Sequence, residues 1–434
     1  MGIELKAIIS FGFLIVIIFS GIPIAFAMGI TGIILLIIFG GGLTVFSVLF
    51  HIAYSSSSDF LIVAIPLFIF MSEILAKAKI TRILYDTFSY WLRWLPGGLS
   101  ISSVTACTLF GAVTGSSVAC TAAIGSIAIP EMRSRGYNNR LATGCIAAGG
   151  GLGILIPPSI PMILYGHVTQ TSVGKLFMAG LIPGILLWLI YSVYIVIRAT
   201  ISPELAPKIK EQVSWRTRFS SLLQVIPVLI IIIAVMGAIY TGICTPTEAA
   251  AVGCLASMIV VFAYKRLTLQ ILKESILETL RITSMVIMII IGAMTYGYVI
   301  TQEGIVTWVS EQVLTMGISP IGIIIMINIL IIFLGSLLEV VSIILLTMPL
   351  IAPILVGFNF DLIWFGAVMV VNMELALVTP PVGLNLYVVK GIVPDLPFSE
   401  IMKGVIPFIL LQLFGLALII AIPQIALFLP SLMY

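Results

Sequence analysis

The stretch GGGLGILIPPSIPMILYG, residues 149–166, lies within a long apolar segment and yet contains five glycines and three prolines. In a helix interior, glycine costs about 1 kcal/mol and proline about 3 kcal/mol relative to alanine. A helix that enters this stretch is therefore expected to break. In a lipid bilayer such a break leaves backbone groups without partners at a cost of several kcal/mol each, so it needs a specific reason.

The composition of the chain indicates a membrane protein. Of its 434 residues, 61% are hydrophobic and 9% are charged, and the mean hydropathy is +1.27. Apolar runs long enough to cross the hydrocarbon recur throughout, which predicts one polytopic, all-α unit in the lipid bilayer. The formal charge of +3 is too small and too dispersed to suggest a nucleic-acid partner. The five cysteines follow neither disulfide nor metal spacing.

Ten membrane crossings are predicted, together with two apolar segments that do not fit single crossings. The crossings are 4–20, 24–40, 59–76, 138–166, 176–198, 219–240, 246–263, 282–301, 361–391 and 404–430. The first is interpreted as a retained span, although residues 25–27 resemble a signal-peptide cleavage site. The other two segments, 97–130 and 320–355, have polar or glycine residues at their midpoints and are predicted to be re-entrant hairpins.

The distribution of positive charge supports these hairpins. With both segments entering and leaving on one side, 18 of the 20 Lys and Arg residues fall on one face, and only Lys6 and Lys175 lie opposite. By the positive-inside rule that face is cytoplasmic and both termini are outside. A single crossing at either segment would abolish this asymmetry.

The broken stretch has a counterpart in the second half of the chain. The residues Pro157-Pro158, Tyr165, Gly180 and Pro183 are echoed by Pro380-Pro381, Tyr387, Gly404 and Pro407. We therefore divide the chain into repeats at 1–217 and 218–434. Each repeat has three spans, an amphipathic segment (79–94 or 303–316), a hairpin, a broken helix (138–166 or 361–391) and a final span. Five crossings per repeat require the second to be inverted, as in secondary transporters.

Backbone oxygens released at the breaks, with hydroxyls at the hairpin tips, are hard ligands suited to Na⁺ as the coupling ion. The first predicted sodium site comprises Gly115, Ser116, Ser117, Gly151, Gly153, Ile156, Pro157 and Pro158. The second comprises Gly335, Ser336, Thr379, Pro380 and Gly383. Substrate contacts are expected at Thr114, Ser159, Glu339 and Asn385. Alternatively, the Ser116 and Ser117 hydroxyls bond back to their own helices.

The kinds of charged residue expected within the apolar segments limit how the protein can bind an anionic substrate. No Lys or Arg is expected at mid-depth, so an organic anion would need bound cations and helix N-termini to balance its charge. Carboxylates in or near the spans are candidate functional groups because charge is costly there. They are Glu73, Glu248, Glu339 and Glu374. Glu339 is favoured because it lies near a hairpin tip, whereas Glu248 is more simply a first-turn helix acid.

Four stretches together resemble a known family. They are GAVTGSSVACTAAIGSIAIPEMRSRGY, GGGLGILIPPSIPMILYG, YTGICTPTEAAAVG and LVTPPVGLNLYVVKG. In this order they are similar to the large membrane subunit of tripartite ATP-independent periplasmic (TRAP) transporters. The resemblance covers essentially the whole chain.

The resemblance implies sodium-driven import of a small organic acid across the bacterial inner membrane. A periplasmic substrate-binding protein would deliver a C4-dicarboxylate, sialic acid or related carboxylate, and a small four-helix membrane subunit would be a separate chain. It also implies an elevator motion, with arms at 79–94 and 268–280. The alternatives are a stand-alone cation-coupled symporter and a channel. A membrane enzyme is not expected, since no Walker, HExxH or GxSxG motif occurs.

Overall fold

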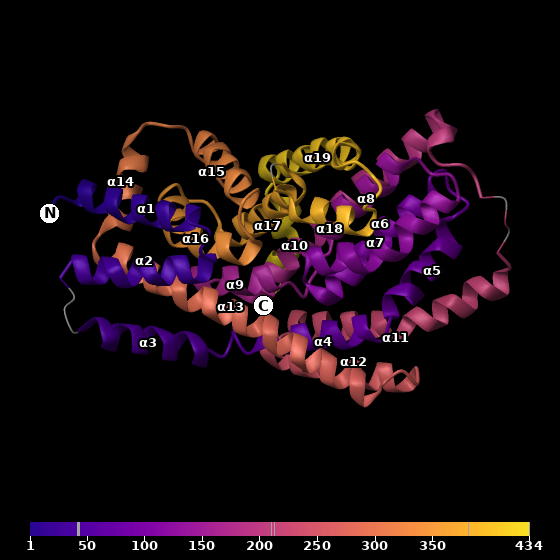
Figure 1. Ribbon diagram of the computed structural model, residues 1–434, viewed down its shortest axis with the longest axis horizontal. Coiled ribbons are helices and arrows are strands. Elements are labelled where there is room, and N and C mark those ends of the chain that lie inside the picture. Colours follow the sequence, from indigo (N-terminus) through magenta and orange to yellow (C-terminus); the bar gives the residue numbers. More distant parts are fainter. Residues whose placement is uncertain (41–43, 210, 212, 381, 434) are drawn as a thin grey trace.

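The computed structural model describes residues 1–40, 44–209, 211, 213–380 and 382–433 of the chain. Within these residues the regular structure is helical throughout, with no strand (Figure 1). This confirms the predicted all-α class. The second proline of the Pro380-Pro381 pair lies outside the described residues.

The first half of the chain forms ten α-helices and a short 3-10 helix. They are α1 (Ile3–Phe19), α2 (Ile24–Ile38), α3 (Thr44–Ser58), α4 (Ala64–Lys77), α5 (Ile80–Leu92), α6 (Gly98–Thr114), α7 (Ser117–Ser134), α8 (Asn139–Leu152), α9 (Ile160–Thr169), α10 (Val173–Ile201) and η1 (Pro203–Leu205). The next helix begins at Trp215, so the boundary predicted between residues 217 and 218 falls inside its first turn.

The second half continues with ten further helices. They are α11 (Trp215–Tyr240), α12 (Pro246–Ala263), α13 (Leu269–Gln302), α14 (Ile305–Thr315), α15 (Pro320–Gly335), α16 (Val340–Gly357), α17 (Leu362–Val378), α18 (Leu384–Ile392), α19 (Phe398–Ala421) and α20 (Gln424–Ser431). In both halves two consecutive helices with a short turn, α6–α7 and α15–α16, precede a helix that is interrupted near its middle.

Six helices in the described part of the chain are long and apolar enough to cross a membrane: α10, α11, α12, α13, α16 and α19. Five of them coincide with predicted crossings, whereas α16 belongs to the predicted hairpin 320–355. The crossings predicted at 4–20, 24–40 and 59–76 correspond to shorter helices, α1, α2 and α4, of 17, 15 and 14 residues. Length and composition alone thus support fewer full-length spans than the ten predicted.

Two elements differ from the sequence-based expectation. Helix α3 occupies residues 44–58, where no helix was predicted; its 15 residues are too few for a full-length span and end in four serines. Helix α13 runs for 34 residues and joins the predicted arm 268–280 to the following span without interruption. The separate amphipathic helix of the second half is α14, in the place that α5 has in the first half.

The interrupted helices begin in the same way in both halves. The Asn138 side chain accepts a hydrogen bond from the Arg140 backbone N–H at 2.9 Å, which caps α8. Asp361 caps α17 by accepting from the N–H groups of Ile363 and Trp364. Such caps satisfy N–H groups that a helix leaves without partners in its first turn.

The helices pack as two groups. In the first, called the frame, α13 contacts α2, α3 and α4, and α12 contacts α4 and α11. In the second, called the hairpin body, α8 contacts α6, α7 and α19, and α17 contacts α10 and α15. The frame follows the lower and left-hand part of Figure 1, and the hairpin body lies above it. The two groups meet where α4 contacts α6 and where α13 contacts α16.

Glycines allow the interrupted helix α8 to approach its neighbours closely. A Cβ atom added to Gly144 would lie 2.1 Å from the backbone oxygen of Gly404 in α19. A Cβ on Gly404 would lie 2.3 Å from the backbone oxygen of Arg140. A Cβ on Gly180, the counterpart of Gly404 in the sequence repeat, would lie 2.2 Å from the backbone oxygen of Leu155. Gly180 therefore packs α10 against the broken stretch, and Gly404 packs α19 against the start of α8.

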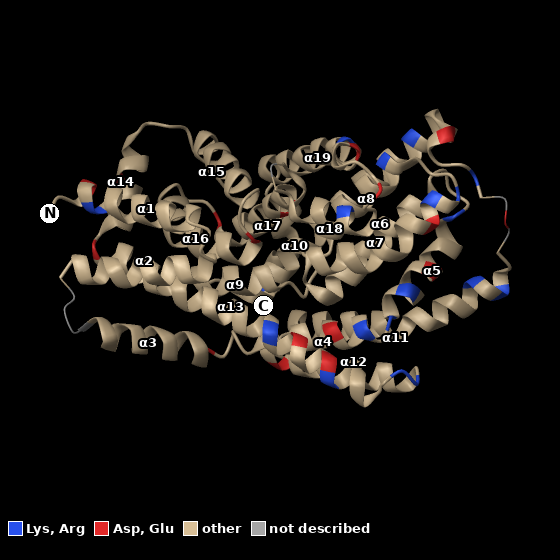
Figure 2. Ribbon diagram, viewed as in Figure 1, with Lys and Arg blue, Asp and Glu red and all other residues tan. Residues whose placement is uncertain are grey.

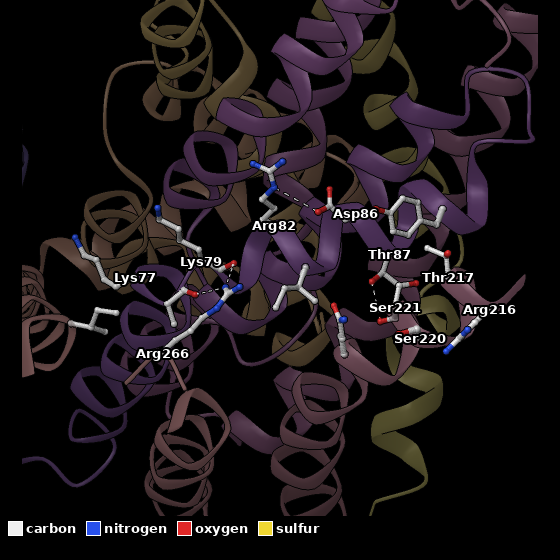
Figure 3. Close-up of a pocket in the computed structure, with 15 residues that line it drawn as sticks. Lys77, Lys79, Arg82, Asp86, Thr87, Arg216, Thr217, Ser220, Ser221 and Arg266 are labelled. Atoms are coloured by element: carbon white, nitrogen blue, oxygen red, sulfur yellow. Dashed lines mark hydrogen bonds and ion pairs between the residues drawn. The ribbon is translucent and has the colours of Figure 1, made fainter. Parts of the chain in front are cut away.

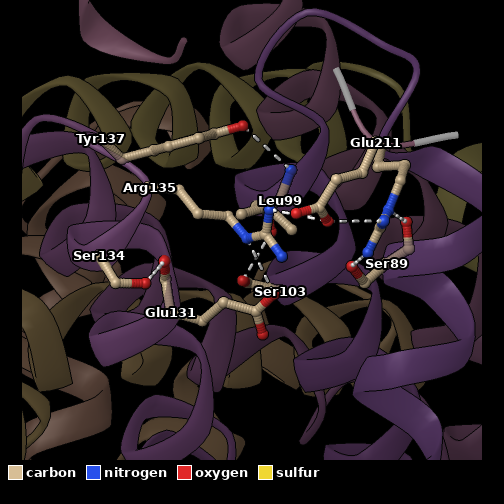
Figure 4. A network of polar contacts seen from close by, with 9 residues as sticks. Ser89, Leu99, Ser103, Glu131, Ser134, Arg135, Tyr137 and Glu211 are labelled. Atoms are coloured by element: carbon tan, nitrogen blue, oxygen red, sulfur yellow. Dashed lines mark hydrogen bonds and ion pairs between the residues drawn. The ribbon is translucent and has the colours of Figure 1, made fainter. Parts of the chain in front are cut away.

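Basic residues lie mainly at one end of the molecule. Figure 2 shows most Lys and Arg residues in the right-hand and lower parts of the view, far from the N-terminus. At the N-terminal end, Lys6 pairs with Glu303 at 2.5 Å. At the other end, Arg135 contacts both Glu131 and Glu211 at 3.3 Å, in the polar network of Figure 4. That network fastens the segment between the two halves to the end of α7.

Candidate functional site

The tip of the first hairpin lies against the broken helix. Helix α6 ends at Thr114, and Gly115, with φ +59°, turns the chain into α7. A Cβ atom on Gly115 would lie 3.3 Å from the backbone N of Ile160 and the backbone O of Pro158. Glycine is suited to this turn because it adopts positive φ without strain and adds no side chain at the contact. The two parts of the first predicted sodium site therefore meet.

The interruption between α8 and α9 leaves a run of backbone oxygens without hydrogen-bond partners. The Ile154 N–H still bonds to the Gly151 oxygen at 3.0 Å and the Leu155 N–H to the Leu152 oxygen at 3.3 Å, after which the helical pattern ends. Within the described residues, no hydrogen bond reaches the backbone oxygens of residues 153–158. The buried Ser159 hydroxyl likewise finds no partner there. Buried polar groups of this kind normally require a ligand or water, and carbonyl oxygens suit a hard cation such as Na⁺.

The two serines of the hairpin tip have different surroundings. The Ser116 hydroxyl accepts a bond from the Ala119 N–H at 3.3 Å and so caps its own helix. The Ser117 hydroxyl instead accepts a bond from the Asn385 side chain at 2.7 Å. Local bonding, the alternative considered for both serines, thus describes Ser116 only.

The second hairpin tip also contacts a broken helix. A Cβ atom on Gly335 would lie 2.4 Å from the Ala376 Cβ in α17. Ser336 donates to the Phe333 backbone oxygen at 2.8 Å, and Thr379 donates to that of Leu375 at 2.6 Å. Their hydroxyl oxygens keep lone pairs while the protons are engaged.

The turn between α17 and α18 completes the second group of predicted ligands. Gly383 has φ +58°, and a Cβ there would lie 3.2 Å from the Thr379 backbone oxygen. Pro380 is exposed, in contrast to the buried Pro157 and Pro158 of the first break. The second break is therefore the more open of the two.

Asn385 joins the two halves of the chain. Its side-chain nitrogen donates to the Ser117 hydroxyl at 2.7 Å and to the Ala147 backbone oxygen at 3.0 Å. The first residues after the second break are thereby fastened to the hairpin and the interrupted helix of the first half. Asn385 is fully buried, and its side-chain oxygen has no partner among the described residues.

Both hairpin tips and both breaks border one cavity of about 190 Å³. The first half contributes the tip residues Thr114, Gly115, Ser116 and Ser117, with Ile154 and Ile160 from the break; the second half contributes Glu339, Leu377 and Leu384. Of the predicted substrate contacts, Thr114 and Glu339 line the cavity, whereas Ser159 and Asn385 are not among its lining residues. The frame closes the remaining side through α4 and α13.

Two polar lining residues of the cavity were missing from the predicted site. Ser72 and Glu73 of α4 line the cavity together with the hairpin tips. Glu73 had been noted as a carboxylate in an apolar segment, but nothing in the sequence relates α4 to the hairpins. Its placement in one cavity with Glu339 follows from the packing of the frame against the hairpin body.

The other two candidate carboxylates are hydrogen-bonded to neighbouring residues outside the cavity. Glu248 forms a capping box with Thr245, whose N–H donates to the carboxylate at 2.8 Å, as the first-turn alternative suggested. Glu374 is buried in α17 and accepts a bond from the Gln412 side chain at 3.3 Å. Neither lines the cavity.

Comparison with known proteins agrees with this architecture. Residues 11–425 match the family model of the "tripartite ATP-independent periplasmic transporter, DctM component". A C4-dicarboxylate TRAP transporter large permease protein from Pseudomonas aeruginosa is 38% identical over 381 residues, covering 87% of this chain and 88% of that protein. A sialic acid TRAP transporter large permease protein from Vibrio cholerae is 32% identical over 375 residues, covering 86% and 87%.

A solved structure supports the fold independently. The YdaH transporter of Alcanivorax borkumensis superimposes with a TM-score of 0.61, covering 90% of this chain and 89% of that one, at 12% identity. This likeness concerns the fold alone. Since the relatives of high identity are named transporter permeases and not enzymes, and the family model spans nearly the whole sequence, the chain belongs to the DctM component family of the tripartite ATP-independent periplasmic transporters.

Proposed function

We propose that this chain is the large, transporting subunit of a sodium-coupled importer of a small organic acid, working by an elevator motion. The observation that carries the proposal is the single cavity on which both hairpin tips and both helix breaks converge. In secondary transporters built from inverted repeats, substrate and coupling ions bind where broken helices of the two repeats meet.

The cavity's chemistry favours coupling to a cation. Among its described lining residues, the only charged side chains are those of Glu73 and Glu339. An organic anion entering beside two carboxylates meets repulsion unless bound cations offset it. The free oxygens of residues 153–158, of which Ile154 lines the cavity, and the hydroxyls of Ser116 and Ser117 would hold one Na⁺ beside it. The oxygens around Gly335, Ser336 and Thr379 would hold a second.

The packing of the two helix groups fits an elevator motion. In this proposal the hairpin body carries substrate and ions, and the frame stays fixed in the bilayer. Helix α5 contacts α6 and α7 on one side and α11 on the other, while α14 lies between α16 and α13. These two helices are therefore placed to act as the arms between the groups. The proposal also includes an inverted arrangement of the two repeats. It places the chain in the inner membrane with both termini in the periplasm.

The substrate and partners are proposed from the family. The two relatives described above are named for C4-dicarboxylate and sialic acid, so the substrate class is a small carboxylate. The family description specifies a tripartite, periplasmic system with this chain type as one component. We therefore propose a separate small four-helix membrane subunit and a periplasmic substrate-binding protein as partners.

Uptake into proteoliposomes tests the proposal. The chain is reconstituted with its small subunit, and the loaded binding protein is supplied outside. We expect accumulation of the acid above its outside concentration when sodium is high outside, and none with a potassium gradient. Uptake without the binding protein would instead indicate a stand-alone symporter. Equilibration without accumulation, at any sodium gradient, would indicate a channel and contradict the proposal.

A further inference from the structure

A strongly basic pocket lies between the frame and the arm helix α5, apart from the cavity described above. It has a volume of about 770 Å³ and is formed where the end of α4 and the arm helix α5 face α11 and the start of α13. Its described lining includes five cationic side chains and one carboxylate. The cations are Lys77, Lys79, Arg82, Arg216 and Arg266. Such an excess of positive charge around one cavity suits an anionic ligand.

The positive charge of this pocket is largely unbalanced. Its carboxylate, Asp86, lies 3.6 Å from Arg82. Among the described residues, no carboxylate forms an ion pair with the other four cations. Arg266 is held in place because it donates to the backbone oxygens of Ala78 at 2.8 Å and Lys79 at 3.2 Å.

Hydroxyl groups on the opposite wall add neutral polar groups. The Ser221 hydroxyl donates to the Arg218 backbone oxygen at 2.7 Å, and the Thr217 hydroxyl shares a bond with that of Ser214 at 2.9 Å. Within the described residues, the Ser220 hydroxyl is therefore the neutral donor on this wall that is left for a ligand. Figure 3 shows Lys77, Lys79 and Arg266 on one side of the pocket and Arg216 with Thr217, Ser220 and Ser221 on the other. Cationic groups and hydroxyls arranged around a cavity provide the donors that a phosphate oxygen accepts. The pocket therefore suits a phosphate ester.

An apolar groove opens from this pocket along the outside of the frame. It has a volume of about 360 Å³, lies between α11 and α12, and shares Ser220 and Gln224 with the basic pocket. Its other lining residues include Leu223, Pro227 and Ile259. Leu223 and Ile259 are exposed on the surface of helices long enough to span a membrane. A charged pocket continuous with such a groove matches the two parts of a phospholipid.

We propose that the basic pocket and the adjoining groove form a binding site for an anionic phospholipid. The phosphate headgroup lies among Lys77, Arg216 and Arg266, and the acyl chains follow the groove between α11 and α12. The five cations belong to the face that the charge distribution assigns to the cytoplasm, where the membrane surface is rich in anionic lipid. This site shares no lining residue with the transport cavity.

Native mass spectrometry of the delipidated full-length chain tests the site. Phosphatidylglycerol is titrated against phosphatidylcholine of the same acyl chains. We expect phosphatidylglycerol to bind more tightly, and the Lys77→Gln/Arg216→Gln variant to weaken its binding by roughly fivefold per charge removed. The matched control is Arg281→Gln/Lys403→Gln, which removes the same charge outside the pocket and should change binding less than twofold. Equal binding of the two lipids, or equal effects of the two variants, would overturn the proposal.

A second variant separates a lipid from a free anion and does not depend on the charge changes. Ala263→Trp would fill the groove while leaving the basic pocket intact. We expect it to weaken phosphatidylglycerol binding without changing the binding of glycerol 3-phosphate. If it leaves the lipid unaffected, or if glycerol 3-phosphate binds as tightly as the lipid, the groove holds no acyl chain and the lipid assignment is wrong.

Discussion

At the scale of single residues, the two serines of the first hairpin tip show what a sequence can and cannot establish. Glycine and serine at the midpoint of an apolar segment predicted a turn near the break at 150–158, and Gly115 does contact Pro158 and Ile160. The bond from Asn385 to Ser117 could not be predicted, because it joins positions 268 residues apart in the chain. Sequence spacing carries no information on such a contact until the helices are packed.

Removal of a hydroxyl at either predicted sodium site should weaken sodium activation. In Ser116→Ala and Thr379→Val the hydroxyl oxygen is lost, and in Ser116→Ala the side-chain cap of α7 is lost with it. We expect the half-saturating sodium concentration for uptake to rise roughly fivefold, corresponding to about 1 kcal/mol for one lost polar ligand. The measurement is the sodium dependence of uptake in proteoliposomes, with correct insertion verified by protease accessibility.

A matched serine on the same helix serves as the control for this prediction. Ser126 is exposed on α7 and donates to the Ala123 backbone oxygen at 3.0 Å, away from the cavity. Ser126→Ala should leave sodium activation unchanged. The site assignment is wrong if both site variants behave like Ser126→Ala.

At the scale of elements, the sequence predicts best where residue types break or cap a helix. Glycine and proline indicated the interruption at 149–166, and α8 ends at Leu152 within it. The sequence failed where no breaker stands, as in α13, whose 34 residues run through the predicted join near 281. It also missed α3, whose 15 residues are too few for a full-length span and end in four serines. Residue propensities predict where helices end more reliably than they predict which helices cross the membrane.

The contact between α6 of the first hairpin and the broken helix leaves no room for a side chain at Gly111. A Cβ there would lie 2.3 Å from the Gly153 Cα, which forces α6 away from the break. We expect Gly111→Ala to lower the stability of the folded protein by about 1–3 kcal/mol, as other overpacked sites do. The measurement is thermal unfolding in detergent, together with transport activity.

A variant at another helical glycine separates the effect of the close contact from the effect of helix propensity. Gly237 in α11 has no atom within 4 Å of an added Cβ. Gly237→Ala should leave the unfolding temperature unchanged or raise it, because alanine is the better helix former by about 1 kcal/mol. A similar loss of stability in both variants would show that the close contact of Gly111 with Gly153 is not the cause.

At the scale of the whole molecule, the proposed elevator mechanism requires the frame and the hairpin body to move as separate units. Helix α13 of the frame contacts α16 of the hairpin body, and Gly297 lies at this boundary, where an added Cβ would be 3.9 Å from the Pro349 Cγ. Within the frame, a Cβ on Gly253 would be 2.7 Å from the Met71 sulfur. One pair therefore spans the boundary between the groups, and the other lies inside a single group.

Cross-linking these pairs tests the elevator motion directly. Both pairs are introduced as cysteines after the five free native cysteines have been replaced by alanine. A disulfide between Gly297→Cys and Pro349→Cys should abolish uptake in proteoliposomes, and reduction should restore it, because the hairpin body could no longer slide along the frame. A disulfide between Met71→Cys and Gly253→Cys should leave uptake intact, since it joins helices that keep their relative positions. Full uptake with the boundary pair cross-linked would mean that transport proceeds without this motion, and the cavity would then have to open by local movement of the hairpin tips.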